Sequence, residues 1–490
     1  MKKLCISVTL ILCLLMLWGC AAEVVPGPSG TEAPETAAPA TKPTTEPATV
    51  PTTEPATEAT TIPTTEPPRE SVAAPATEPT TVPTTAPTEP ETVPPTEPVA
   101  RNPQNDPEVY QYADMKAMWF SQFDLAGVFR DGSTQREETS YRSMMAQILD
   151  RVKEQGFNTV FLQIRPYADS MYPSQVYPMS AYVVGQTGGT VRYDPVAIAV
   201  ELAHERELSI HAWINPMRGM TEQEITLVGT EYAIRRWYDD PQLRGRYIVS
   251  VSGRWYLNPA YAEVVDLICA GAEEALRSYD FDGLHMDDYF YPTTDTSFDA
   301  EAYGSHQAEG ESLADFRREN LNGLVRRLYA MTHELGGGRI FGVSPAGNVD
   351  TVVNSQYADV YRWCGESGYL DYICPQVYFG LEHGSLDFVK VCQTWQSMIR
   401  TDDVDLIIGM TFGKAFSEED QWAGSGKDEW KNNKDVLARC LMTTRELERC
   451  RGISVFCYQY FFDPLTGAQV AQTAQEQANF IPVLREIHWN

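Results

Sequence analysis

Two adjacent carboxylates, Asp287 and Asp288, are the sharpest chemical feature of the sequence, and they close a segment, 283–288, that is predicted to be a β-strand. Side chains alternate along a strand, so Asp287 should share a face with His285, and Asp288 should face the opposite way. A carboxylate in this position can stabilise the positive charge that a sugar ring acquires while a glycosidic bond breaks. The pair therefore indicates glycosidic chemistry, with Asp287 as the nucleophile or the group that stabilises the cation.

Other chemistry is open at the same pair. Together with His285, Asp287 and Asp288 can hold a divalent metal ion through hard oxygen ligands. No second cluster of His and Asp residues with ligand spacing accompanies them in the sequence, so we expect neither a metal nor a cofactor. For Asp288 a structural role is also open, in which its side chain caps the loop that follows.

Glycoside hydrolysis requires a second carboxyl group as general acid, and the sequence does not single one out. Asp169, which follows the predicted strand 159–165, is a candidate. Asp288 is another, although neighbouring side chains of a strand diverge. Participation of an N-acetyl group of the substrate would relax the requirement. Further carboxyls near strand ends are Asp350, Glu382 and Asp463.

Other side chains near the ends of predicted strands are suited to hold a sugar. Arg165 and Arg218 can bind a carboxylate by bidentate pairing, and rim salt bridges are the alternative. Asn215 and Gln376 can hydrogen-bond to hydroxyl or acetamido groups. The aromatic side chains that we expect to stack on sugar rings are Trp213, Tyr289 and Tyr378.

These side chains require a scaffold, and eight apolar segments alternate with eight amphipathic helical ones. The predicted strands are 116–123, 159–165, 209–215, 283–288, 340–344, 372–377, 406–411 and 453–458. The predicted helices are 141–155, 195–207, 261–279, 313–335, 356–363, 385–400, 432–449 and 468–487.

This alternation predicts a parallel (β/α)8 TIM barrel, in which the active site lies at the carboxyl ends of the strands. An open doubly wound sheet is the alternative, but no Gly-x-Gly-x-x-Gly motif follows a strand to support a nucleotide-binding fold. Two long connections, 217–258 and 292–312, are predicted to be structureless walls of the active site.

The first 105 residues differ in composition from the rest of the chain. Lys2 and Lys3 precede an apolar run that is typical of a secretory signal peptide and too short for a good membrane-spanning helix. Residues 21–100 hold 19 of the 33 prolines and no aromatic residue, so we expect a disordered Pro/Thr/Glu-rich stalk or a spacer without a length requirement. The predicted domains are a signal peptide (1–20), a linker (21–105) and a barrel (106–490).

Charge and cysteine usage exclude several classes of protein. The formal net charge is −29, which argues against a nucleic-acid partner because phosphate binding needs a basic surface. After residue 20 the number of cysteines is odd and no Cys-x-x-Cys motif occurs. We therefore expect buried free thiols, not a disulfide framework or a zinc site.

Several motifs resemble those of known families. The segment Leu17-Trp18-Gly19-Cys20 resembles the lipobox of bacterial lipoproteins, in which Cys20 would carry the lipid, and an ordinary cleaved signal is the alternative. A longer series of motifs, in order over residues 114–465, resembles the glycosyl hydrolase-like family 10. The motifs are FLQIRP at 161–166, HAWINPMR at 211–218, WYLNP at 255–259, DGLHMDDYFYP at 282–292, SPAG at 344–347 and DYICPQVY at 371–378.

The second resemblance implies a TIM barrel, a location in the cell envelope and glycosidase activity, with peptidoglycan glycan strands as substrate. Segment 282–289 also resembles the Asp-Gly-x-x-x-Asp-x-Glu strand of chitinase-type barrels. Tyr289 occupies the position of the catalytic Glu there, so that mechanism does not transfer directly. The resemblance implies site roles for Arg165, Asp169, Asn215, Arg218, Asp287, Asp288 and Gln376. With peptidoglycan as substrate, the carboxylate that Arg165 and Arg218 would bind is the lactyl group of muramic acid.

We therefore expect a glycoside hydrolase that cleaves an N-acetylhexosamine polymer. The lipid at Cys20 would anchor it to the outer face of the bacterial cell membrane, facing the cell wall. The alternatives are a barrel that binds cell-wall glycan without catalysis, and an interaction or structural protein displayed on a stalk.

Overall fold

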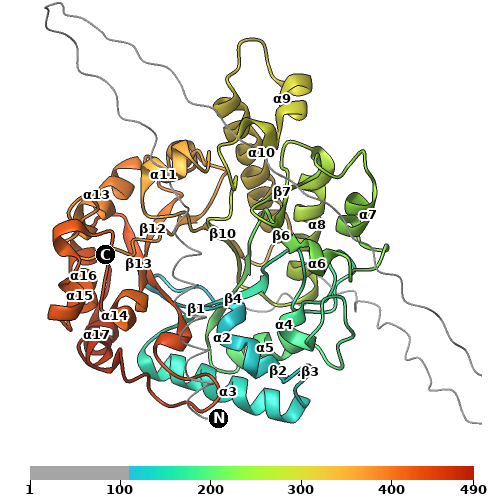
Figure 1. The fold of residues 1–490 in the computed structure, drawn as a ribbon. Helices are drawn as coiled ribbons and strands as arrows, with labels where there is room; N and C mark the ends of the chain where they lie inside the picture. The colour runs from blue at the N-terminus through green and yellow to red at the C-terminus, as the bar shows by residue number, and fades with distance from the viewer. Residues whose placement is uncertain (1–109, 490) are drawn as a thin grey trace, which may run out of the picture. The chain divides into compact units, whose positions relative to one another are not determined.

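The computed structural model describes residues 110–489, and its centre is a closed barrel of eight parallel strands (Figure 1). In spatial order the strands are β1-β13-β12-β11-β10-β9-β5-β4. Each predicted strand overlaps one of them. The (β/α)8 prediction is therefore confirmed, and the open sheet is excluded because β1 pairs with both β13 and β4. The bounds are β1 Met115–Phe120, β4 Thr159–Arg165, β5 Ser209–Ile214, β9 Gly283–Met286, β10 Ile340–Val343, β11 Tyr372–Ile373, β12 Asp405–Thr411 and β13 Cys450–Phe456.

Helices surround the barrel, and each predicted helix overlaps one of them (Figure 1). Local sequence signals determine where helices begin. In the helix Pro195–His204, Asp194 accepts hydrogen bonds from the backbone N–H groups of Val196 and Ala197, and Pro195 takes the first helical position, where no N–H partner is needed. The last three predicted helices are too long, since irregular segments flank them. The bounds are α3 Glu138–Gln155, α5 Pro195–His204, α8 Ala262–Ser278, α10 Leu313–Glu334, α12 Val360–Gly365, α13 Phe388–Met398, α16 Val436–Thr443 and α17 Ala474–Glu486.

Six predicted strands extend past the observed ones at their carboxyl ends: β5 and β10 by one residue, β9 and β13 by two, and β1 and β11 by more. Strand β1 stops at Phe120 because Ser121 and Asp124 form a capping box that starts helix α2 (Gln122–Phe129). Strand β11 is short because Pro375 has no N–H to donate to a ladder, and Gln376 pairs only through isolated bridges. Strand β9 ends at Met286, so the two carboxylates lie just beyond it.

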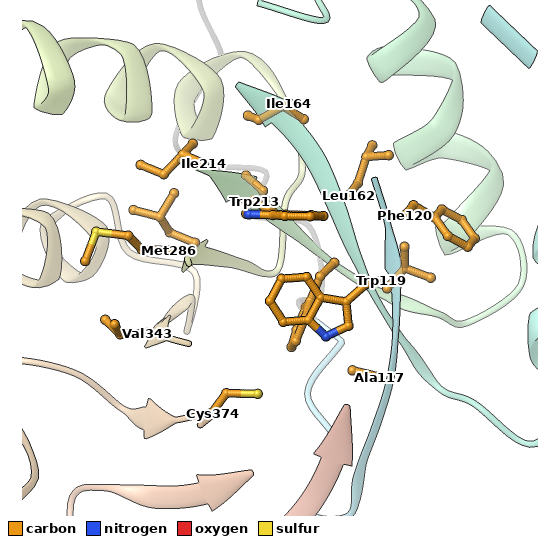
Figure 2. Close-up of a cluster of buried hydrophobic side chains, with 14 of the residues drawn as sticks. Ala117, Trp119, Phe120, Leu162, Ile164, Trp213, Ile214, Met286, Val343 and Cys374 are labelled. Carbon is orange, nitrogen blue, oxygen red and sulfur yellow. The ribbon is translucent and has the colours of Figure 1, made fainter. Parts of the chain in front are cut away.

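The barrel interior is packed with the rings of Trp, His and Tyr side chains. Figure 2 shows Trp119 turned inward below Trp213, while Phe120, the next residue, is turned away from the interior. Further in, the Nδ1 atoms of His211 and His285 lie 3.0 and 2.8 Å from the hydroxyl of Tyr372. Burial lowers the pKa of His211 to about 3 and lowers that of His285 as well. The inward position of His285 agrees with the predicted alternation along this strand.

The connection 217–258 is folded, so the prediction that it is structureless is wrong, while its role as a wall of the active site stays a prediction. It contains a three-stranded antiparallel sheet in the order β6-β8-β7 and two short helices. Strands β7 and β8 are joined by a tight turn in which Ser252 and Gly253 have φ of 49° and 80°, as a two-residue hairpin requires. The bounds are β6 Arg218–Thr221, α6 Glu222–Ile225, α7 Ala233–Asp239, β7 Ile248–Val251 and β8 Arg254–Leu257.

The connection 292–312 is also partly folded, with a 3₁₀ turn (η1, Thr296–Phe298) and helix α9 (Ala300–His306). A fully buried ion pair between Arg317 of α10 and Asp299, with an N–O distance of 2.7 Å, ties it to the helix layer. Tyr291 and Tyr357 lie 5.1 and 4.8 Å from the Arg317 guanidinium.

The thiol prediction is confirmed for the described residues: all seven cysteines there are free and buried. Burial raises the pKa of several of them, including Cys364 and Cys374, to about 12, so these thiols remain protonated and unreactive.

The amino-terminal predictions lie outside the described residues. They are the signal peptide 1–20 with Cys20, and the stalk 21–105. They stay predictions. Between Tyr110 and Trp489, none of the helices combines the length and apolarity that crossing a bilayer demands.

Candidate active site

Asp287 is held in one orientation by donors from a neighbouring strand. It is 2% exposed. Its Oδ2 accepts hydrogen bonds from Nε1 of Trp213 at 3.0 Å and from Nδ2 of Asn215 at 2.5 Å. Its Oδ1 accepts the backbone N–H of Tyr289 at 3.3 Å. Because Trp213 and Asn215 lie at the end of β5 and Asp287 follows β9, the carboxylate is fixed where two adjacent strands end.

A chain of amides sets the orientation of Asn215. The backbone N–H of Gln122 donates to Oε1 of Gln163 at 2.8 Å, and Nε2 of Gln163 donates to Oδ1 of Asn215 at 2.6 Å. The Asn215 oxygen is thereby occupied, and its amide nitrogen is left to donate to Asp287. This series of hydrogen bonds joins the ends of β1, β4, β5 and β9. Four barrel strands together therefore fix the position of Asp287.

Asp287 and Asp288 are electrostatically linked. Burial and then the charge of Asp288 raise the pKa of Asp287, while the hydrogen bond from Trp213 and the charge of Arg218 oppose the rise. Burial also raises the pKa of Asp288, against a hydrogen bond from Gln376. Two neighbouring carboxylates, Asp287 buried and Asp288 half-buried, resist carrying two charges at once. The pair therefore keeps a proton to a higher pH than exposed carboxylates do.

Asp169 is a second buried carboxyl, on the segment after β4, and it is 5% exposed. Its Oδ1 accepts the N–H of Tyr167 at 2.8 Å, and Ala168 between them has a left-handed backbone with φ of 54°. Such a conformation costs a residue with a side chain about 1–2 kcal/mol. Burial raises the pKa of Asp169 to about 6 and Glu224 adds to the rise, while hydrogen bonds from Ser180 and Tyr167 oppose it. A carboxyl with this pKa keeps its proton in weakly acidic solution and suits a general acid.

Arg218 connects the two carboxyl-bearing segments. Its guanidinium lies 4.7 and 4.0 Å from the ring centres of Tyr167 and Tyr289. Tyr167 precedes Asp169 by two residues and Tyr289 follows Asp287 by two. The structure therefore brings the Asp169 segment and the Asp287 segment into contact with one arginine.

Arg165, also predicted to bind substrate, is placed differently. It is buried, and its terminal nitrogens donate to the backbone carbonyls of Asn215 and Pro216 at 2.6 and 3.0 Å. Its guanidinium also lies 4.7 Å from the ring of Tyr177. These contacts support the segment that carries Asn215, so the geometry assigns Arg165 a positioning task.

The other predicted binding residues take several positions. Trp213 and Asn215 are buried, and their polar contacts are with Asp287, as described above. Gln376 is half-buried and donates to the carbonyl of Ser344 at 3.1 Å. Tyr378 is half-buried with its ring 6.1 Å from that of Phe456. Their contacts with a sugar stay predictions.

The remaining carboxyl candidates are exposed at the surface: Asp350, Glu382 and Asp463. Asp169 is thus the candidate acid outside the Asp287–Asp288 pair that combines burial with a raised pKa. Among residues 110–489, no group of three or more His, Cys, Asp or Glu side chains is arranged to hold a metal ion.

Sequence reasoning missed four residues of this site. Gln122 and Gln163 have buried side-chain amides. A glutamine inside an otherwise apolar strand is the signal that could have identified Gln163. Arg254 of the inserted sheet lies 4.3 Å from the ring of Tyr167. Glu224 reaches the Asp169 environment from helix α6, and no local pattern distinguishes it from an ordinary helix-capping glutamate.

A parallel barrel with buried carboxylates, an arginine and aromatic rings at the carboxyl ends of its strands defines the class of glycosidase-like TIM barrels. The model of the family Glycosyl hydrolase-like 10 matches residues 114–424, and the chain belongs to this family.

Two bacterial relatives support the assignment. The chain is 28% identical over 372 residues to the glycosyl hydrolase YngK of Bacillus subtilis, which covers 72% of this chain and 68% of YngK. It is 29% identical over 350 residues to the glycosyl hydrolase DigH of Escherichia coli, covering 66% of this chain and 79% of DigH. Among solved structures, the glycoside hydrolase domain of PgaB from Bordetella bronchiseptica is similar, with a TM-score of 0.46 and 14% identity over 75% of this chain and 98% of that domain.

Proposed function

We propose that the protein is a glycoside hydrolase that cleaves a β-linked N-acetylhexosamine polymer, the glycan strands of peptidoglycan. The observation that carries the proposal is the fixed carboxylate of Asp287. Trp213 of β5 and Asn215, the first residue after that strand, donate to one of its oxygens. Asp287 follows the adjacent strand β9 at the barrel end where TIM-barrel sites lie. The family membership and the names of the two relatives support the same reaction class.

In this proposal Asp169 is the general acid. Its pKa of about 6 keeps a proton available for the departing sugar oxygen in weakly acidic and near-neutral solution. The Asp287–Asp288 pair supplies the negative charge that stabilises the oxocarbenium-like transition state. Trp213 and Asn215 prevent Asp287 from turning away while that charge develops. An N-acetyl group of the substrate can act as the nucleophile in place of a protein side chain. Asp287 then orients and stabilises that N-acetyl group.

Incubation of the purified, detergent-solubilised chain with peptidoglycan glycan strands, followed by mass spectrometry of the products, tests the proposal. We expect released oligosaccharides whose reducing-end sugar identifies the bond that is cut. Asp287→Asn keeps the size and shape of the side chain and should lower turnover by about 10²–10³-fold or more. Asp350→Asn, at an exposed carboxylate, is the matched control and should retain activity.

The outcomes separate catalysis from binding. Release that persists in Asp287→Asn contradicts the role of this residue. No release by the unchanged chain, with co-sedimentation of the chain and insoluble peptidoglycan, identifies a glycan-binding barrel without catalysis instead.

We also propose that a lipid on Cys20 anchors the protein at the outer face of the bacterial membrane. The lipobox-like segment and the Pro-rich stretch that follows it support this location. Metabolic labelling with a fatty acid should mark the chain and should fail to mark Cys20→Ala. Equal labelling of both chains contradicts the anchor.

A further inference from the structure

A cavity of about 560 Å³ lies outside the group of Asp169, Arg218 and Asp287. One wall is the stretch 131–140, which comprises the hairpin of β2 (Arg130–Asp131) and β3 (Thr134–Gln135) and the first turn of α3. The other wall is the segment 184–192, before α5. Figure 1 shows the hairpin beside helix α4 (Ala181–Val184). The volume is within the range of cavities that bind small molecules, about 300–1,000 Å³.

Hydrogen bonds and close packing hold the two walls together. The backbone N–H of Arg192 donates to Oε1 of Gln135 at 2.7 Å, and Nε2 of Gln135 donates to the carbonyl of Tyr193 at 3.0 Å. The guanidinium of Arg192 donates to the carbonyl of Gln135. At the end of α4, a Cβ on Gly185 would collide with the carbonyl of Ser133, so the hairpin turn packs directly against this helix. The cavity is therefore preformed, and a ligand binds there without ordering a loop.

The charges that line the cavity are balanced. Arg192 pairs with Glu137 at 2.8 Å, and a guanidinium nitrogen of Arg136 lies 4.0 Å from a carboxylate oxygen of Asp131. Two arginines and two carboxylates cancel, so the cavity favours neither an anion nor a cation. An arginine only donates hydrogen bonds and a carboxylate only accepts them. A ligand that fits must therefore both donate and accept.

The other lining groups are mostly hydroxyls, those of Thr134, Ser140 and Thr190. Among the described residues at the surface of the cavity, Val184 alone is apolar. A lipid or a flat apolar ring would cover these polar groups without replacing their hydrogen bonds to water, which is costly. The hydroxyls of a neutral sugar donate and accept, so they satisfy arginines, carboxylates and hydroxyls alike.

Helix α4 is common to the cavity and the candidate active site. Its N-cap residue Ser180 donates a hydrogen bond to Asp169. The ring of Tyr182 lies 6.2 Å from that of Tyr167, which belongs to the Asp169 segment. Val184, the last residue of the helix, lines the cavity. Four residues at 1.5 Å each make the helix about 6 Å long. A sugar polymer that extends from Asp169 across this short helix therefore reaches the cavity.

We propose that the cavity is a subsite for a neutral sugar unit of the glycan chain that is being cleaved, at a distance from the scissile bond. The inference rests on the proposed function and adds a preference for chain length. An oligosaccharide that fills both the active site and the cavity is held by the hydrogen bonds of the cavity walls, whereas a short one is not.

Two β-linked N-acetylhexosamine oligosaccharides, of two and of eight units, test the inference. The double variant Asp131→Ala/Ser140→Ala removes a carboxylate and a hydroxyl from the cavity. The side chain of Asp131 is 82% exposed and Ser140 is half-buried, so the fold should not change. With two hydrogen bonds lost, kcat/KM for the long compound should fall about tenfold or more, and kcat/KM for the short one should stay the same.

A second variant, Thr190→Trp, places a large side chain at the exposed rim of the cavity and should cause the same selective loss by occupying it. The matched control is Thr394→Trp. Thr394 is an exposed threonine of α13, the helix that follows β11, and it does not line the cavity. Its replacement should leave both rate constants unchanged.

A long-chain preference that stays unchanged in the double variant and in Thr190→Trp overturns the inference, and so does an equal loss on both compounds. Failure of the proposed function is a different result, namely hydrolysis of neither compound. Calorimetric binding of the two compounds then decides the inference. Tighter binding of the long compound that is weakened in Asp131→Ala/Ser140→Ala supports it, and equal binding or no binding overturns it.

Discussion

Replacement of Asp169 by Asn should make the protein more stable and less active, and the gain in stability should depend on pH. In the folded chain burial raises the pKa of Asp169 from its ordinary value of 3.8 to about 6. Between these values the folded state keeps a proton that the unfolded chain has released. Stability therefore falls as the pH rises from about 4 to about 6 and stays at its lower level above that range.

The size of the effect follows from the same shift. At 1.36 kcal/mol per pH unit, a pKa of about 6 in place of 3.8 corresponds to about 3 kcal/mol of lost stability at neutral pH. The asparagine side chain would carry no charge at any pH and would keep an oxygen to accept the N–H of Tyr167. The Asp169→Asn variant should thus exceed the parent chain by up to about 3 kcal/mol at pH 7–8, and this advantage should vanish near pH 4.

Urea unfolding followed by tryptophan fluorescence, in steps from pH 4 to pH 8, measures this difference, with Asp350→Asn as the exposed control. An advantage that does not change with pH, or a variant that is less stable at pH 8, refutes the reasoning. The same variant should lose about 10²–10⁴-fold in turnover if Asp169 is the general acid. A stabilised variant with full activity would show that Asp169 is buried for a reason other than catalysis.

Two further predictions concern the groups that hold the site. Trp213→Phe removes a hydrogen bond that lowers the pKa of Asp287, so the acidic limb of the pH–rate profile should move upward by about one pH unit, and an unchanged limb contradicts this role of the indole. Arg317→Met leaves Asp299 as an unpaired charge in a fully buried position, so the free energy of unfolding, measured with urea, should fall by about 3–5 kcal/mol. A fall below about 1 kcal/mol would mean that the 292–312 connection rearranges to hydrate the carboxylate.

Much of the fold was predictable because it depends on local pattern. Strand β4 has the predicted bounds, Thr159–Arg165, since a continuous apolar run with an arginine at its end identifies a strand covered on both faces. The errors lie where short-range chemistry competes with that pattern. Phe123 continues an apolar run but belongs to helix α2, because the side chain of Asp124 caps the helix. The hairpin at Ser252 and Gly253 is likewise a local signal, and it makes the insertion a folded sheet.

The site was predictable in composition but less so in roles. The carboxylates, the arginines and the aromatic residues near strand ends could all be named from the sequence. Their tasks could not be assigned, since Arg165 and Arg218 look alike in the sequence and differ in what surrounds them. Arg165 donates to two backbone carbonyls, while the guanidinium of Arg218 lies 4.7 and 4.0 Å from the ring centres of Tyr167 and Tyr289.

The sequence by itself determined the barrel and the kind of chemistry available at one end of it, because period, capping and residue type act over a few neighbouring positions. Only the tertiary structure decided which oxygen of Asp287 is held, which carboxyl is withdrawn from water and which arginine donates to the backbone beside Asn215. Those properties arise from segments far apart in the chain, such as Gln163 acting through Asn215 on Asp287. A pKa, a hydrogen-bond direction and a free charge all depend on what surrounds a group, and here folding brings those surroundings together from several barrel strands and an inserted sheet.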